Sequence, residues 1–267
     1  MIPYYQFTTL NIGPITIQVW GLMVSLGIAA ALVVIYKRAK RFGLDTQLIF
    51  DMAFWLLFGA LLGARVLYVV YNPTYIFASF WNFFRVWEGG MSIMGGFLGS
   101  LLAAYFVWRK RRFDFLAYAD VMLFGLPLGL FIGRLGCGAI HDHIGKPTTL
   151  PWGIAWPDGT VRHENGLYLS LKGLVLFVIM LLAHRKPRWK GFTTVLFLIL
   201  YGTVRFFLDF LRAVDLPGVS DVRYFGLTPA QYLSIVMVLF GGYLYWRLRL
   251  RKSVVATHSA QHSMTNS

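Results

Sequence analysis

The sequence predicts an all-α integral membrane protein with seven transmembrane helices, its N-terminus outside the cell and its C-terminus in the cytoplasm. Three observations support this fold class. Of the 267 residues, 57% are hydrophobic and 13% are charged, whereas ordinary soluble domains contain about 25% charged residues. The apolar residues also form long unbroken runs, and basic residues gather in clusters between these runs.

Each apolar run is long enough to be a spanning helix, because about 20 apolar residues cross a hydrocarbon core about 30 Å thick. A closed β-barrel would instead show short segments of alternating polarity. The seven expected spans are 15–36, 48–71, 92–108, 115–133, 166–183, 192–211 and 229–246.

The basic clusters set the expected orientation. They follow the first, third, fifth and seventh spans, and positively charged loops remain in the cytoplasm. The net charge of +14 therefore reflects membrane topology, and we expect no nucleic-acid partner. The four clusters are KRAKR at 37–41, RKRR at 109–112, RKPRWK at 185–190 and RLRLRK at 247–252.

The remaining segments complete the expected organisation. Residues 1–252 form one transmembrane domain, and the polar residues 253–267 form a disordered cytoplasmic tail. The start MIPYYQF lacks the basic region of a cleavable signal peptide, so we expect the first helix to be retained. Two outer loops are long: 72–91 is rich in aromatic residues and 134–165 is rich in proline and glycine.

Charged residues inside the apolar runs point to a site. Arg65 and Arg205 lie roughly 10 Å below the outer surface at about 1.5 Å per residue, and Arg134 lies near that surface. A charge at the centre of a span costs about 2.5–3.5 kcal/mol and usually faces a cavity or a bundle interior. Because guanidinium groups fit phosphate oxygens, we predict a site for an anionic lipid headgroup.

Structural interpretations remain open for several of these residues. Tyr201, Arg205 and Asp209 recur at intervals of four, so Arg205 and Asp209 can equally form a buried ion pair that fixes helix packing. We interpret Asp51 and Asp120 as structural, and we expect Lys172 and Arg212 to extend their charges to the membrane surface.

The glycine-rich and histidine-rich segments also allow two interpretations. Gly95 and Gly99 have the GxxxG spacing of closely packed helices, although bare backbone there could admit a headgroup. In the stretch GRLGCGAIHDHIG at 133–145, Cys137 is more typical of a packing residue than of a nucleophile. His141 and His143 have no third ligand at a diagnostic spacing, so we expect neither a metal nor a cofactor.

An ordered set of motifs resembles the bacterial prolipoprotein diacylglyceryl transferases over most of the chain. It consists of WGLM at 20–23, GAR and YVVYN within 63–72, GGMS and GGFLG within 90–99, GRLG at 133–136, PWGIAWP at 151–157 and YGTVRFFLDFLR at 201–212. The resemblance implies a multi-pass protein of the bacterial inner (cytoplasmic) membrane, with a periplasmic N-terminus and an active site toward the periplasmic leaflet.

The implied reaction moves the diacylglyceryl group of phosphatidylglycerol to the thiol of the lipobox cysteine in an exported prolipoprotein. Its implied partners are phosphatidylglycerol, the prolipoprotein signal peptide and membrane lipids. The catalytic residues implied by matching positions are Arg134, Arg205, Asp142, Tyr201 and Asp209. The implied substrate-binding residues are Arg134, Arg205, Gly95, Gly96, Gly145, Trp20 and Arg65.

Departures from the family pattern leave the proton acceptor open. Met94 replaces the histidine of the family's HGG motif, Trp20 replaces a tyrosine and Cys137 replaces an asparagine, while residues 164–166 replace a Pro-Ser-Gln stretch. His141, Asp142 or His163 could supply a base, or the arginines could act alone. The alternatives are a lipid-binding paralogue with another acceptor or no turnover, and a small-solute transporter that uses Arg205 and Asp209 as a relay.

Overall fold

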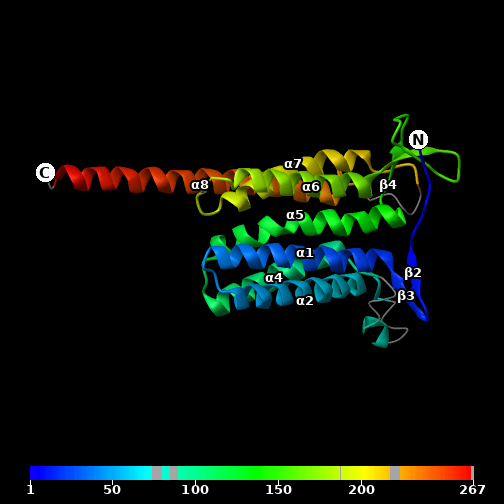
Figure 1. The fold of residues 1–267 in the computed structure, drawn as a ribbon, viewed down its shortest axis with the longest axis horizontal. Coiled ribbons are helices and arrows are strands. Elements are labelled where there is room, and N and C mark those ends of the chain that lie inside the picture. Colours follow the sequence, from blue (N-terminus) through cyan, green and yellow to red (C-terminus); the bar gives the residue numbers. More distant parts are fainter. Residues whose placement is uncertain (74–79, 85–89, 187, 217–222, 266–267) are drawn as a thin grey trace. The chain divides into compact units, whose positions relative to one another are not determined.

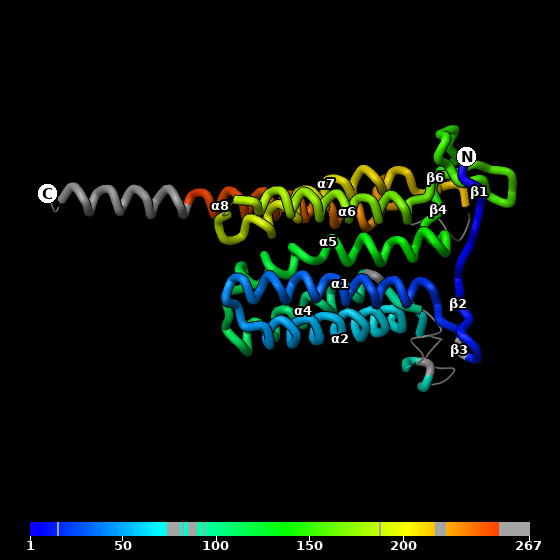
Figure 2. Tube along the Cα trace, in the orientation of Figure 1, coloured from blue at the N-terminus to red at the C-terminus, as the bar shows by residue number. Residues whose placement is uncertain are grey.

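The computed structural model describes residues 1–73, 80–84, 90–186, 188–216 and 223–265 (Figures 1 and 2). Side chains beyond Leu250 lie outside this description, so the expected disorder of 253–267 stays a prediction. Parts of the loop expected at 72–91 also lie outside it. The chain is mostly helical. Its helices are α1 (Val19–Arg41), α2 (Thr46–Tyr71), η1 (Phe80–Phe84), α4 (Ile93–Arg111), α5 (Phe115–Ile140), α6 (Asn165–Ala183), α7 (Phe192–Leu208), η3 (Asp209–Leu211) and α8 (Pro229–Thr265).

Among the described residues, six helices are long and apolar enough to cross a membrane. They are Val19–Arg41, Thr46–Tyr71, Phe115–Ile140, Asn165–Ala183, Phe192–Leu211 and Pro229–Leu250. This confirms the prediction of an α-helical membrane protein at the level of six spans. Helix α4 covers the remaining expected span, but its last turn carries Arg109, Lys110 and Arg111, which shorten its apolar part.

The chain divides into two compact units. Residues 1–37 and 119–267 form the larger unit, and residues 38–118 form the smaller unit. Arg134, Arg205, Tyr201 and Asp209 belong to the larger unit, whereas Arg65 and the glycines of the GxxxG motif belong to the smaller one.

In the smaller unit, α2 and α4 pack through glycines. A Cβ atom added to Gly95 would overlap the carbonyl oxygen of Gly63, and one added to Gly99 would overlap that of Gly59. Helices in lipid gain little from the hydrophobic effect between them, so close backbone approach drives their association. The packing interpretation of the GxxxG motif is therefore confirmed.

Asp51 and Asp120, which we expected to be structural, each accept hydrogen bonds that connect two elements of the fold. Asp51 of α2 accepts from Arg111 of α4 at 3.0 Å. In the larger unit, Asp120 of α5 accepts from the backbone N–H groups of Gly191 and Thr194 at 2.6 and 2.8 Å, which satisfies donors left open at the start of α7. Both side chains hold two helices together.

Helix α5 extends further than predicted. The sequence placed the start of a loop at residue 134, but α5 continues to Ile140, so this boundary was wrong. Leu135, Ala139 and Ile140 continue the apolar character of the helix. It ends where His141 adopts a φ of 54°, a left-handed conformation that commonly terminates helices.

A small sheet follows α5, where the sequence predicted an irregular loop. Its strand order is β1 (Ile2–Pro3), β5 (Ile154–Ala155), β6 (Val161–Glu164) and β4 (Ile144–Pro147), with β1 parallel to β5 and the other pairs antiparallel. A separate hairpin joins β2 (Thr9–Ile12) to β3 (Ile15–Gln18). These strands are too short for period-two patterning to reveal them.

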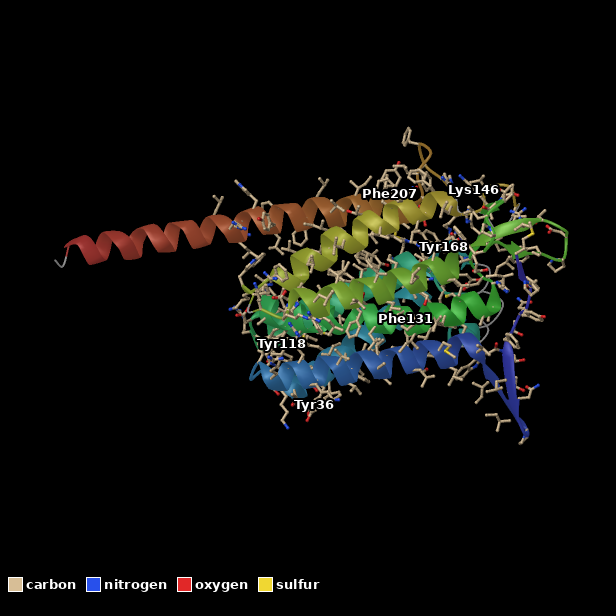
Figure 3. The ribbon with its side chains drawn as sticks, turned by 45° about the horizontal axis from the view of Figure 1, so that its top comes forward. Tyr36, Tyr118, Phe131, Lys146, Tyr168 and Phe207 are labelled. Carbon is tan, nitrogen blue, oxygen red and sulfur yellow. The ribbon has the colours of Figure 1, made fainter. Side chains whose placement is uncertain are left out.

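The remaining helices of the larger unit pack side by side, with α7 along α8 and along α6 (Figure 1). Ser170 of α6 donates its hydroxyl hydrogen to the carbonyl of Phe131 on α5 at 2.7 Å; Phe131 is labelled in Figure 3. Phe124, Met180 and Phe197 form a buried cluster from α5, α6 and α7. This packing fixes the faces that α6 and α7 present to each other.

Candidate functional site

The face of α7 predicted from the spacing of four is present. Arg205 Nη2 lies 3.0 Å from Asp209 Oδ1, and the Asp209 side chain is completely buried. The hydroxyl of Thr228 donates to the other carboxylate oxygen of Asp209. The expected ion pair is confirmed, and Thr228 helps to hold its acidic member in place.

Lys172 contradicts the sequence expectation. It was expected to reach the membrane surface, but it is buried with 6% of its surface exposed. Its Nζ atom lies 3.6 Å from the centroid of the Tyr201 ring, a close cation–π contact. The expectation was wrong because Lys172 lies on the face of α6 that packs against α7. Its position within the apolar run 166–183 was the signal available in the sequence.

The positive charges of this region act on one another. Lys172 experiences the charges of Arg205 and Arg134, and Asp209 is the acidic residue acting on it within the described part of the chain. Arg205 in turn experiences the charge of Arg134. We call Arg134, Lys172 and Arg205 the basic cluster. The buried carboxylate of Asp209 acts on Lys172 and Arg205, and the three basic side chains leave an excess of positive charge that suits an anionic ligand.

Arg134, the member of the basic cluster on α5, contacts two side chains from the end of α5 and the segment after it. Its Nη1 atom lies 2.8 Å from His143 Nε2 and 3.6 Å from Cys137 Sγ. The other ring nitrogen, His143 Nδ1, lies 2.5 Å from Asp142 Oδ1. Asp142 and His143 therefore form a hydrogen-bonded pair that ends on Arg134.

The surroundings of Cys137 agree with the packing interpretation. Its thiol is buried, and Trp20 of α1 lies against it. Ligand atoms of Cys137, Asp142 and His143 come within 4.8 Å of one another, which is a geometric requirement for a metal site. The guanidinium of Arg134 contacts two of the three groups, however, and its positive charge opposes a cation at this position.

Both ring nitrogens of His141 make hydrogen-bonding contacts. Its Nε2 atom lies 3.1 Å from the carbonyl oxygen of Tyr5, and its Nδ1 atom lies 2.6 Å from Glu164 Oε2. The ring also stacks on Tyr4. Burial raises the pKa of Glu164. His141 therefore anchors the N-terminal segment to the start of α6.

His163 lies on β6, and its Nδ1 atom lies 2.9 Å from the hydroxyl oxygen of Tyr168. Burial lowers the pKa of His163, which favours its neutral form. On the same strand, Arg162 holds Asp215 through contacts of 3.1 and 2.6 Å. This ion pair raises the pKa of Arg162 and lowers that of Asp215, and it ties β6 to the segment after α7.

Other predicted site residues make mainly structural contacts. Arg65 is 1% exposed, and it donates to the carbonyls of Phe83 and Gly90 at 2.9 and 2.8 Å. A Cβ atom on Gly145 would meet His163 at 2.5 Å, so this glycine allows β4 to approach β6. Gly96 contacts α2 less closely than Gly95 does. Their predicted substrate-binding roles remain predictions.

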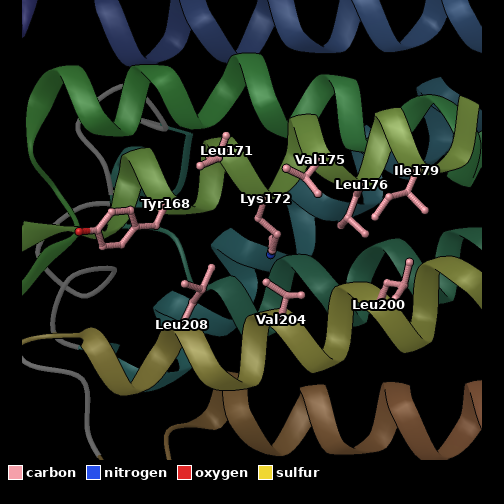
Figure 4. A pocket seen from close by; sticks show the side chains of 9 residues that line it. All are labelled: Tyr168, Leu171, Lys172, Val175, Leu176, Ile179, Leu200, Val204 and Leu208. Carbon is pink, nitrogen blue, oxygen red and sulfur yellow. The ribbon is translucent and has the colours of Figure 1, made fainter. Parts of the chain in front are cut away.

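A cavity of about 300 Å³ lies between α6 and α7. Lys172 points into this space between the two helices (Figure 4). Except for Tyr168 and Lys172, the lining side chains are aliphatic: Leu171, Val175, Leu176, Ile179, Leu200, Val204 and Leu208. The cavity therefore combines a hydrocarbon surface with one buried cation, as the two ends of an anionic lipid require.

The fold and this site define a class: a multi-pass helical membrane protein with a cluster of basic side chains between its helices. Residues 8–247 match the family model described as "Prolipoprotein diacylglyceryl transferase". The chain belongs to this bacterial membrane protein family, as the resemblance predicted.

Several relatives are similar over nearly their whole length, and all carry the name phosphatidylglycerol–prolipoprotein diacylglyceryl transferase. One from Pseudomonas fluorescens is 35% identical, covering 92% of this chain and 95% of the relative. One from Bordetella parapertussis is 36% identical, with coverages of 92% and 97%. One from Nitrosomonas europaea is 35% identical, with coverages of 92% and 91%.

Proposed function

We propose that this chain transfers the diacylglyceryl group of phosphatidylglycerol to the lipobox cysteine thiol of exported prolipoproteins. Family membership supports the reaction class. The observation that carries the assignment to this site is the basic cluster, in which the charges of Arg134, Lys172 and Arg205 act on one another and one buried carboxylate, that of Asp209, acts on Lys172 and Arg205. A phosphodiester supplies the missing negative charge, and the leaving glycerol phosphate gains further charge that the same cations stabilise.

Each residue of the site then has a role in the proposal. Arg134 and Arg205 hold the phosphate, while Tyr201 and Asp209 orient the side chains of Lys172 and Arg205. The aliphatic cavity between α6 and α7 accommodates hydrocarbon of the lipid. Trp20 and Gly96 remain proposed contacts of the substrate.

The proposal extends to topology. Helix α4 forms a seventh span, and residues 1–252 act as one transferase domain. The positively charged segments at 37–41, 109–112, 185–190 and 247–252 keep the C-terminus in the cytoplasm. The basic segment RKRR at 109–112 precedes α5, and Arg134 follows its apolar part at the opposite end of the helix. With this orientation, the site faces the periplasmic leaflet of the inner membrane, where exported precursors arrive.

A labelled-phosphatidylglycerol assay with a lipobox peptide tests the reaction. We expect the purified protein in membranes to transfer the label to the peptide cysteine, and Arg134→Ala to abolish both transfer and lipid binding. Complementation of a transferase-depleted strain, with and without Met94→His, tests the function in cells. Absence of transfer in membranes that support another family member would contradict the proposal.

A paralogue that binds the lipid without this transfer is the second candidate, favoured by Met94 at the family's histidine position. It predicts that the wild-type chain binds phosphatidylglycerol through Arg134 but does not restore growth to the depleted strain.

A further inference from the structure

The proposed reaction requires a proton acceptor, because a thiol with an ordinary pKa of about 8.5 is mostly protonated at neutral pH. Met94 has no basic nitrogen, so this position cannot supply one. The structure distinguishes between the histidines of the larger unit by what each ring nitrogen contacts. The following inference rests on the proposed function and deepens it.

The contacts of His143 fix its tautomer. Arg134 lies 2.8 Å from Nε2, and a guanidinium group has only N–H donors. Nε2 must therefore accept, and it carries the lone pair. The proton of the neutral ring is then on Nδ1, which lies 2.5 Å from the carboxylate of Asp142 and donates to it.

The hydrogen bond to Asp142 keeps the proton of the His143 ring on Nδ1 and leaves Nε2 as the basic nitrogen. A carboxylate that accepts from one ring nitrogen orients the imidazole and stabilises the imidazolium after it gains a proton at the other nitrogen. The His143 side chain is 16% exposed and that of Asp142 is 33% exposed. The pair is thus held in place but remains accessible, as a base for an incoming peptide must be.

The ring contacts of His141 and His163 are with groups outside the basic cluster. His141 Nε2 faces the Tyr5 carbonyl and Nδ1 faces Glu164, so both nitrogens are engaged. His163 pairs with the Tyr168 hydroxyl on β6. His143 is the one whose ring contacts a member of the basic cluster through the described contacts.

We propose that His143 is the general base that removes the proton of the acceptor thiol, with Asp142 as its positioning residue. The S–H proton moves to Nε2, and the thiolate attacks the glycerol carbon that bears the phosphate. The S–C bond forms while the C–O bond to phosphate breaks. Glycerol phosphate leaves with the electron pair, and the imidazolium then returns its proton to the leaving phosphate or to water.

Lipid binding prepares the base in this proposal. Before the lipid binds, an N–H of Arg134 occupies the lone pair of His143 Nε2. Phosphate oxygens form stronger, charge-assisted bonds with guanidinium than a neutral nitrogen does. A bound phosphodiester therefore draws Arg134 away from His143, and Nε2 becomes free to accept the thiol proton.

A pair of acceptor peptides tests this role. One carries the lipobox cysteine, and the other carries selenocysteine, whose selenol ionises far more readily and needs no base. We expect His143→Gln to lower turnover on the cysteine peptide about 100-fold or more, as loss of a general base does, but turnover on the selenocysteine peptide less than about 10-fold. His141→Gln and His163→Gln test the competing histidines and should not discriminate between the peptides.

Asp142→Asn provides a second variant, because an amide cannot stabilise the imidazolium. We expect the same selective loss, of about 10-fold or more. Binding of phosphatidylglycerol verifies that each variant is folded. If His143→Gln does not bind the lipid, the selective loss on the cysteine peptide is measured with Asp142→Asn instead. Equal losses on both peptides, no loss, or a selective loss in His163→Gln would overturn the assignment of His143. If the wild-type protein modifies neither peptide, the proposed function itself fails.

Discussion

The ammonium nitrogen of Lys172 lies 3.6 Å from the centroid of the Tyr201 ring, inside the apolar contact between α6 and α7. Such a placement brings a third cation to the pair of arginines that the sequence already indicated. The ring offers the ammonium only a weak partner, so an anionic ligand gains from binding here.

Lys172→Met is expected to raise the KM for phosphatidylglycerol about 10-fold or more, because a hydrogen bond to a charged group contributes about 1.5–3 kcal/mol. The initial rate of transfer as a function of lipid concentration measures this effect. Lys146→Met, on β4, is the matched control and should change KM less than about twofold. An unchanged KM in Lys172→Met would exclude a contact with the phosphate.

Two ion pairs of the protein differ in burial, which allows a second prediction. Asp209→Asn leaves Arg205 without its buried partner, and such a loss costs about 3–5 kcal/mol. Asp51→Asn breaks a pair whose side chains are 30% and 59% exposed, where about 0–1 kcal/mol is typical. Melting temperatures in one detergent should therefore fall strongly for Asp209→Asn and little for Asp51→Asn. Similar decreases would contradict the structural importance of Asp209.

The pair of Arg162 and Asp215 makes part of the stability depend on pH. Arg162 lowers the pKa of Asp215 below its ordinary value of 3.8, so the folded state favours the carboxylate. This contribution is fully present above the ordinary value and is lost as pH falls through the lower folded value. Thermal unfolding should show wild type more stable than Asp215→Asn at pH 7 and at pH 5. The difference in stability between wild type and Asp215→Asn should shrink below about pH 4. A difference that grows on acidification would contradict a stabilising role for this ion pair.

Helix packing in the smaller unit gives a fourth prediction. Gly95→Ala places a methyl group against the carbonyl of Gly63, whereas a methyl group on Gly21 of α1 meets nothing within 4 Å. We expect Gly95→Ala to lower the melting temperature and Gly21→Ala to leave it unchanged or raise it slightly, since alanine favours helices by about 1 kcal/mol. Equal effects would show that α2 and α4 can separate at little cost.

The sequence predicted those features that depend on the type and spacing of residues within one helix. Long apolar runs located the helices, and the spacing of four between Arg205 and Asp209 predicted their contact. The glycines at 95 and 99 predicted close helix packing. These features depend on local periodicity and on the cost of burying charge, which require no knowledge of the tertiary structure.

Other features depend on which helix faces meet, and the sequence does not contain this information locally. Lys172 looked like a residue that reaches the membrane surface, because only the packing of α6 on α7 directs it inward. His143 was considered only as a metal ligand, while His141, two residues earlier, was considered as a base. A left-handed residue at the end of α5 decides which of the two rings meets Arg134, and no spacing rule predicts that conformation.

The pairing of β1 with β5 has a consequence for biosynthesis. The strand at residues 2–3 has its partner at residues 154–155, beyond the first four helices of the chain. The sheet beside the basic cluster therefore cannot close while the ribosome is still producing the early helices. Closure of this sheet therefore follows the synthesis of these four helices, and damage to the N-terminal strand should leave their insertion into the membrane intact while it impairs the sheet.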